Sequence, residues 1–480
     1  MHAEVCGTNN FADELVLGDS SPNAGIPRAQ SKMNRRLPIA ASVTLLATLS
    51  FAGAEARAAV GVGSAHGFAP HQVVVKLAGG RAPHTLPVRR GTDVADVAAA
   101  LRADPRVAYA APNFIATAST APPGERDVPN DPGPISGSPG PPGGWVTKQW
   151  NFLPWQGGAT PLLPISPGGI DAIGAWENLA AAGRPGAQGI TVAVLDSGIA
   201  YRTLSPRFLR SPDFASGQFV KGFDFVDDDR LPLDENGHGT HVAGTIAEKT
   251  NNGIGLAGLA FRAKLMPVRV LDELGRGRAD DIARGIRFAV GHGADVINMS
   301  FNFGCDRRVP AVDEALRQAY KRGVIAVASV GNVGSEACVS PPATGPHAIG
   351  VGGSTQGGCI GSYSLSGKGV DVLAPGGGTP AVGCPSVSAD SIYQVTLKDR
   401  TTNEFSEPSN YVGTSMAAAH VSGVAAMVLA SNGVPRKAKG KWLVARVTRR
   451  LRQTARDLGL PAIRQGAGLI DASKATEPTP

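Results

Sequence analysis

The 480-residue sequence lacks the marks of a membrane or nucleic-acid-binding protein. Apart from one run at residues 37–54, no apolar stretch is long and uninterrupted enough to cross a bilayer. The net charge is +7, but no basic run is interleaved with aromatic residues, so we expect no nucleic-acid partner. With 42% hydrophobic and 18% charged residues, the composition is that of an ordinary globular enzyme with a large core.

The first 58 residues have the pattern of segments that precede a folded protein. Residues 1–32 show no periodic apolar pattern, and we interpret them as an upstream, non-structural leader before a true start at Met33. Residues 33–58 combine a basic start, an apolar run and an Ala-x-Ala end, which is typical of a signal peptide. A transmembrane anchor of marginal length is the alternative. Cleavage near Ala58 predicts a secreted or periplasmic protein with no stable membrane span after signal removal.

A small unit and a linker come next. Residues 59–119 predict an α+β unit, with strands at 72–77 and 107–110 and a helix at 93–104. A unit of this size is marginal alone. The Pro- and Gly-rich stretch at 120–145 predicts an extended linker that is open to cleavage.

From residue 146 to 476 apolar strands alternate with amphipathic helices, which predicts a mainly parallel sheet covered on both faces, an α/β fold of three layers. The last helical segment, 442–455, is basic on its outer side, and we interpret that side as a solvated face. The predicted strands are 190–196, 265–271, 295–301, 324–330 and 347–352, and the predicted helices between them are 278–291 and 309–321.

Three residues in this domain have the types and settings of a nucleophilic site. Ser415 lies in a Gly-containing turn that leads into an apolar helix, where free backbone N–H groups favour an oxyanion. For an isolated serine, helix capping is the simpler interpretation. However, Asp196 ends a buried strand, and His238 lies between glycines at another helix start. The order Asp, His, Ser is that of subtilisin and differs from the order in α/β-hydrolases.

Three motifs resemble those of the subtilisin-like serine peptidases (subtilases): residues 194–198 (VLDSG), 238–244 (HGTHVAG) and 413–417 (GTSMA). The resemblance implies a secreted endopeptidase that hydrolyses protein or peptide substrates, with Asp196, His238 and Ser415 as its catalytic triad. It also implies that the Asn332 amide contributes to the oxyanion hole, and that no cofactor takes part in the chemistry.

The resemblance also assigns the substrate cleft and the precursor. Ser300, Phe301 and Asn302 form one wall of the main specificity pocket, and Val330 and Gly331 form the other. The family usually has glycine where Asn302 stands, which leaves the subsite preference open. Residues 59–119 resemble a subtilase propeptide, an intramolecular inhibitor whose tail at 114–118 lies along the cleft until the enzyme removes it.

A structural calcium ion is a further implication of the family. Residues 250–256 resemble the calcium loop of subtilases, and Gln149 matches another ligand. The usual aspartate shortly after the catalytic one is not evident, because residues 205–207 (SPR) occupy that region. Fewer anionic ligands weaken calcium binding, so the sequence leaves this site open.

Four of the five cysteines lie in the main domain, since Cys6 falls in the leader. An even set in an exported chain suggests two disulfides, with three possible connectivities. Cys305 and Cys338 each follow one of two strands that a parallel sheet brings side by side. We therefore expect Cys305 to pair with Cys338, and Cys359 with Cys384.

Two other functions are compatible with the same scaffold. One is an inactive subtilase that only binds peptides, although the complete set of motif residues argues against it. The other is an esterase that uses the same nucleophile, which a comparison of ester with amide substrates would test.

Overall fold

The computed structural model describes residues 68–80, 82–118, 144–156, 164–252, 254–305, 307–332, 338–385, 390–431 and 440–478. The predicted leader, the predicted signal peptide and most of the predicted linker lie outside these ranges. The chain divides into two compact units, which meet between Phe114 and Ile115.

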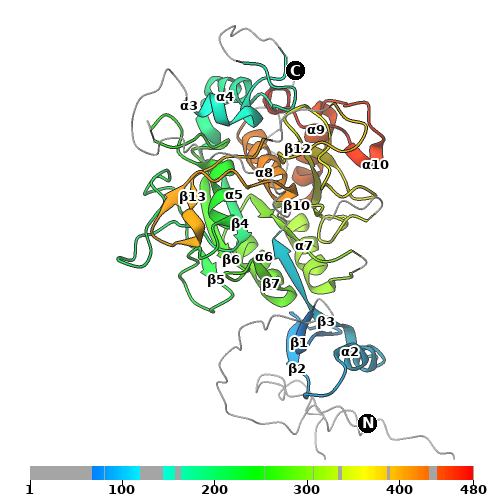
Figure 1. Ribbon diagram of the computed structural model, residues 1–480. Helices are drawn as coiled ribbons and strands as arrows, with labels where there is room; N and C mark the ends of the chain where they lie inside the picture. Colours follow the sequence, from blue (N-terminus) through cyan, green and yellow to red (C-terminus); the bar gives the residue numbers. More distant parts are fainter. Residues whose placement is uncertain are drawn as a thin grey trace, which may run out of the picture. The chain divides into compact units, whose positions relative to one another are not determined.

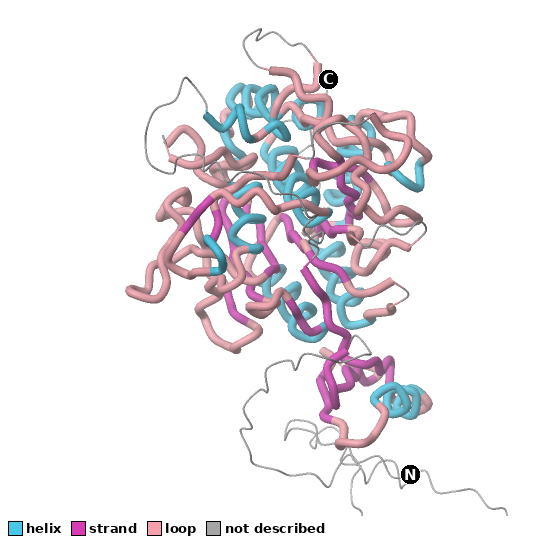
Figure 2. Tube along the Cα trace, in the orientation of Figure 1, coloured by secondary structure: helices cyan, strands magenta, loops and turns pink. Residues whose placement is uncertain are grey.

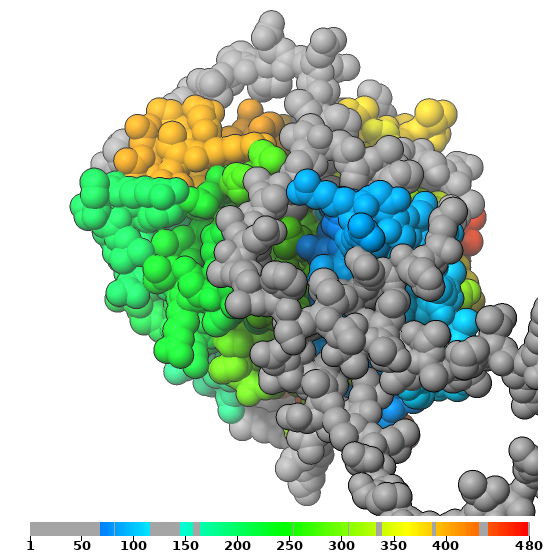
Figure 3. Space-filling model, turned by 90° about the horizontal axis from the view of Figure 1, so that it is seen from below, coloured from blue at the N-terminus to red at the C-terminus, as the bar shows by residue number. Residues whose placement is uncertain are grey.

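The first unit is a small antiparallel sheet with one helix. Strand β1 (Phe68–Leu77) pairs with β2 (His84–Pro87) and with β3 (Val107–Ala118). Helix α2 (Val94–Arg102) begins after Asp93, whose carboxylate accepts hydrogen bonds from two amides of the first turn. Its apolar face and the strands form a core of Val73, Val75, Leu86, Val88, Val94, Val97, Ala98 and Ala110. Strand β3 is longer than the predicted 107–110, and its last four residues belong to the second unit. Figure 3 draws the described residues of the first unit in blue.

The second unit contains a seven-stranded sheet in the order β12-β11-β10-β8-β4-β6-β5, and every neighbouring pair is parallel (Figure 1). The central strands are continuous apolar runs rather than alternating ones, because helices cover both faces. The strands are β4 (Thr191–Asp196), β5 (Phe223–Asp224), β6 (Lys264–Arg269), β8 (Val296–Met299), β10 (Ile325–Ser329), β11 (Ile349–Ser354) and β12 (Val372–Pro375).

Two pairs of helices form the outer layers. Helices α5 (His238–Ala247) and α8 (Thr414–Ala430) pack against each other and the sheet, and α6 (Ala279–Gly291) packs beside α7 (Pro310–Arg322) (Figures 1 and 2). Helix α8 is apolar all round, and every residue of it except Leu429 is buried, as expected for a central helix. The predicted three-layer α/β fold is confirmed.

Shorter elements and one long helix complete the unit. They are α3 (Gly144–Lys148), η2 (Trp150–Phe152), α4 (Ala172–Ala181), η3 (Pro185–Ala187), β7 (Arg276–Arg278), β9 (Phe301–Asn302), β13 (Thr396–Leu397), η4 (Lys398–Arg400), β14 (Phe405–Ser406), α9 (Lys441–Thr454), α10 (Ala462–Gln465) and α11 (Ala472–Thr476). Among the described residues, no helix is both long and apolar enough to cross a membrane.

Candidate active site

Asp196 and His238 form a buried pair. Asp196 is the last residue of β4 and His238 the first of α5, and His238 Nδ1 lies 2.7 Å from Asp196 Oδ1. A carboxylate oxygen accepts, so Nδ1 carries the proton and Nε2 is left as the basic nitrogen. Nε2 is buried and has no hydrogen-bond partner among the described residues. Burial disfavours the imidazolium, but the charge of Asp196 and its hydrogen bond outweigh burial and raise the pKa of His238.

A second carboxylate, that of Asp234, joins the two elements that carry this pair. Asp234 is fully buried and accepts five hydrogen bonds of 2.6–2.9 Å. One comes from the hydroxyl of Ser197, the residue after Asp196. The other four come from the turn before α5 and from the first turn of that helix: Asn236 N, Gly237 N, Thr240 N and Thr240 Oγ1. Ser197 Oγ also accepts from Gly239 N at 3.0 Å. Sequence reasoning missed Asp234, although a carboxylate four residues before a helix-start histidine was a visible signal.

Ser415 is the second residue of α8, directly after a turn at Gly413. Its hydroxyl donates to the carbonyl of Ser300 at 2.9 Å, and the Ser300 hydroxyl donates to the Ser415 carbonyl at 2.8 Å. Ser415 therefore lies at the positive end of the α8 dipole. Ser300, predicted as a wall of the cleft, also orients the start of α8.

The amide of Asn332 is oriented through its oxygen. Oδ1 accepts from Thr414 N at 2.9 Å and from Thr414 Oγ1 at 2.8 Å. Consequently Nδ2 is the free end of the amide, and it is buried without a partner among the described residues. A buried unpaired donor costs on the order of 1–3 kcal/mol, which marks this atom as available for an acceptor that the chain does not supply.

The residues predicted to line the substrate cleft lie close together. Phe301 and Val330 are fully buried, and a Cβ placed on Gly331 would lie 3.5 Å from Asn302 Nδ2. Gly331 has φ of 110°, and the same Cβ would lie 2.7 Å from Leu365 Cδ1, so both its conformation and its surroundings require glycine.

A segment of extended chain lies between two short strands of the second unit. Residues 115–117 of β3 pair antiparallel with β7, and 117–118 pair with β9. The sequence identified β9 as a wall, but it did not identify β7 as the opposite rim. β7 and β9 therefore each present a backbone edge to which an extended chain adds by hydrogen bonds.

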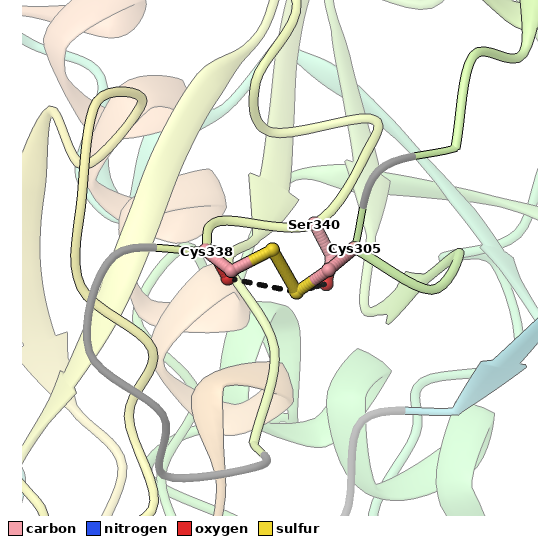
Figure 4. The surroundings of a disulfide bond; sticks show 3 residues. All are labelled: Cys305, Cys338 and Ser340. Atoms are coloured by element: carbon pink, nitrogen blue, oxygen red, sulfur yellow. Dashed lines mark hydrogen bonds between the residues drawn. A yellow bond between two sulfur atoms is a disulfide. The ribbon is translucent and has the colours of Figure 1, made fainter.

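The four cysteines of the domain lie in two close pairs. Cys305 and Cys338 have Cα atoms 5.8 Å apart, and those of Cys359 and Cys384 are 6.0 Å apart (Figure 4 shows the first pair). Both separations are in the range of disulfides, and the partners are those predicted, the first pair from strand adjacency and the second as the two cysteines that remained.

Asp213 contacts the loop that resembles the calcium loop of subtilases. Its carboxylate accepts from Asn252 Nδ2 at 2.6 Å and from Leu256 N at 2.8 Å, inside the predicted calcium loop. Burial raises its pKa to about 7. The sequence, in which residues 205–207 follow Asp196, did not single out this carboxylate; Asp213 lies a few residues further along the same irregular segment. Gln149 lies at the same loop, where its amide exchanges two 2.8 Å hydrogen bonds with the backbone of Ala257.

Comparison with known proteins identifies the family. Residues 187–469 match the model of the subtilase family (Peptidase_S8). The chain is 35% identical to subtilisin BL of Lederbergia lenta over 288 residues, 60% of this chain and 91% of that protein. It is 39% identical to the thermophilic serine proteinase of Bacillus sp. (strain AK1) over 248 residues, 52% of this chain and 54% of that protein. A solved protease of Pseudoalteromonas arctica PAMC 21717 aligns with a TM-score of 0.52 and 29% identity, covering 64% of this chain and 94% of its own. The chain therefore belongs to the subtilase family of subtilisin-like serine peptidases.

Proposed function

We propose that the protein is a secreted serine endopeptidase in which Asp196, His238 and Ser415 form the catalytic triad. The observation that carries the proposal is the buried Asp196–His238 pair, which leaves His238 Nε2 as an unpartnered base. The Ser415 hydroxyl turns from the Ser300 carbonyl to His238, which takes its proton as the oxygen attacks a peptide carbonyl. His238 then returns the proton to the leaving amine, while Asp196 stabilises the imidazolium.

Asn332 stabilises the tetrahedral intermediate in this proposal. Its Nδ2 lacks a partner in the resting protein, and its Oδ1 is held by Thr414, the neighbour of the nucleophile. The amide is thus oriented before the reaction begins, which is the arrangement that makes oxyanion donors effective. The Ser415 backbone N–H is the second donor.

Substrates bind as an extended strand between β7 and β9. The pairing of residues 115–118 with these two strands supports this proposal, because it shows that the edge accepts an antiparallel chain. We also propose that residues 59–119 are a self-removed propeptide, cut between about Thr117 and Trp145 where strand pairing ends. Export through the signal peptide exposes the chain to oxidising conditions, in which the two cysteine pairs form disulfides.

A structural calcium ion fits the loop at residues 250–256, which Asp213 contacts. Burial raises the pKa of Asp213, Glu248 and Glu407. The charge of Glu407 raises the pKa of Asp213 further, and the charges of Asp213 and Glu407 both raise that of Glu248. A cation would offset that repulsion, and Gln149 and residues 250–256 offer the neutral oxygen ligands that calcium accepts. Removing calcium with EGTA should then lower the melting temperature, and adding it back should restore that temperature.

Casein digestion tests the function as a whole. The processed protein should digest labelled casein, and a serine-directed fluorophosphonate should abolish the digestion and label Ser415. Absence of digestion, with correct folding, would support a peptide-binding scaffold instead. Hydrolysis of ester substrates without amide hydrolysis would support the esterase alternative.

A further inference from the structure

The positive charge of this chain is concentrated next to its last long helix. Residues 432–456 contain nine Lys and Arg residues and no Asp or Glu, whereas the whole chain has a net charge of only +7. This stretch includes α9, which buries Val444, Val447 and Leu451 and directs its basic residues outward. The sequence alone indicates a solvated face, and the surface beside α9 changes that interpretation.

A groove of about 790 Å³ runs along α9, here called the α9 groove. Its other walls are residues 343–349 and residues 368, 369 and 371, together with Tyr320 of α7. This volume is in the range of ligand-binding clefts, roughly 300–1,000 Å³.

The α9 groove lies at the edge of the sheet opposite to the candidate active site. It is lined by Ala326 near the start of β10, Ile349 at the start of β11 and Asp371 just before β12. Asp196, in contrast, ends β4. Because all seven strands run parallel, strand starts and strand ends meet at different edges. The groove is therefore separate from the catalytic machinery.

The walls of the α9 groove combine cations with an apolar floor. Neither Lys368 nor Arg449 forms an ion pair with an acidic side chain in the described part of the chain. Arg452 pairs at 3.3 Å with Asp371, the one acidic residue of the lining. The floor contains the apolar residues Ala326, Ala348, Ile349, Val444 and Ala445.

The surroundings of His347, in the lining of the α9 groove, are positively charged. His347 stacks on Tyr320 with ring centroids 4.9 Å apart, and its Nδ1 is buried without a partner among the described residues. Burial lowers its pKa, and Arg317 and Lys321 of α7 lower it further. Cations from α7 and α9 thus flank the same groove.

We propose that the α9 groove is a docking site for an acidic peptide segment that also carries apolar side chains. The cations match its carboxylates, and the apolar floor matches its aliphatic side chains, which nucleic acids and anionic polysaccharides lack. The aromatic ring in the lining, Tyr320, is already stacked on His347, so the groove offers no open platform for a base. Given the proposed peptidase function, the site anchors acidic segments of protein substrates away from the scissile bond.

Binding can be measured without catalysis, using the full chain with Ser415→Ala. The probe is a fluorescein-labelled dodecapeptide of alternating Glu and Leu, followed by fluorescence anisotropy. We expect saturable binding that weakens strongly between 0.1 and 1 M NaCl, as the Debye length falls from about 10 to about 3 Å. Lys368→Glu with Arg449→Glu should weaken binding by about tenfold or more, because two attractions become repulsions.

The matched control is Lys441→Glu with Arg446→Glu, which makes the same charge change at two positions of α9 outside the groove lining. It should shift binding by less than about twofold. Equal losses in the two double variants would overturn the site in favour of diffuse surface charge. A Glu and Ser peptide that binds as well as the Glu and Leu peptide, or tighter binding of a heparin fragment or a DNA oligonucleotide, would overturn the choice of peptide.

The role in substrate capture needs a separate assay on active enzyme. Lys368→Glu with Arg449→Glu should leave hydrolysis of a short chromogenic peptide unchanged. It should lower kcat/KM for a protein substrate that carries an acidic, leucine-containing tail by roughly the factor lost in binding. Unchanged kcat/KM for the tailed protein would refute substrate anchoring. If the unsubstituted protein showed no peptidase activity, that result would instead refute the proposed function, and the binding result would still stand.

Discussion

Replacing Asp234 by Asn tests whether this carboxylate holds the His238 base in place. In the variant, the amide oxygen of the new Asn can take the place of Oδ1 and keep the three bonds that Oδ1 now accepts, from Ser197 Oγ, Asn236 N and Gly237 N. The new amide nitrogen then faces Thr240, whose hydroxyl can reverse its role and accept. The bond from Thr240 N to Asp234 Oδ2 cannot be rescued, because both atoms would be donors.

The magnitude follows from that single lost bond. A hydrogen bond to a charged group contributes about 1.5–3 kcal/mol, so Asp234→Asn should reduce the free energy of unfolding by about 2 kcal/mol. The loosened start of α5 should also lower kcat/KM by roughly tenfold, since a misplacement of about 1 Å can cost about 10²-fold. Asp234 helps to raise the pKa of His238, so neutralising it lowers that pKa. The acid limb of the pH–rate profile, where His238 becomes protonated, should therefore move to lower pH.

Two assays separate the structural and the catalytic effects. Urea denaturation in a Ser415→Ala background gives the change in unfolding free energy without self-digestion, and the pH dependence of kcat/KM is measured with active enzyme. Glu235→Gln is the matched control, because Glu235 bonds Arg207 and Arg269 but makes no bond to α5. The reasoning is refuted if Asp234→Asn matches this control in both the unfolding free energy and the position of the acid limb.

The other predictions concern the nucleophile, the oxyanion, a disulfide and calcium. Ser415→Ala should reduce turnover by about 10⁶, the magnitude known for this family, and the chain should accumulate unprocessed until active enzyme trims it in trans; normal maturation in a host without other proteases would exclude self-processing. Asn332→Ala should lower kcat by roughly 10² to 10³ with little change in KM, and an unchanged rate would mean that another group stabilises the oxyanion. Non-reducing peptide mapping should link Cys305 to Cys338, a bond that should contribute on the order of 2–4 kcal/mol, and a different partner would contradict the strand adjacency. Asp213→Asn should abolish the effect of EGTA on the melting temperature; an undiminished effect would place calcium elsewhere.

Local pattern was enough to predict the elements that carry the candidate triad. Asp196 and His238 lie at the end of a strand and the start of a helix, and both boundaries are encoded by neighbouring apolar and glycine residues. The approach of Cys305 to Cys338 was also predictable, because consecutive parallel strands end at one edge of a sheet. In each case the relevant information spans a few residues or follows from strand order alone.

The contacts of Asp213 and Asp234, the position of β7 and the α9 groove depend on the folded chain. Asp213 and Asp234 lie in irregular segments, where no periodicity encodes the path of the backbone, and each is defined by hydrogen bonds to other parts of the chain. The groove depends on how α9 packs beside segments about a hundred residues earlier in the sequence. Composition reveals the charge of such a surface, but whether the charge lines a hollow or faces open solvent depends on side-chain packing between distant segments.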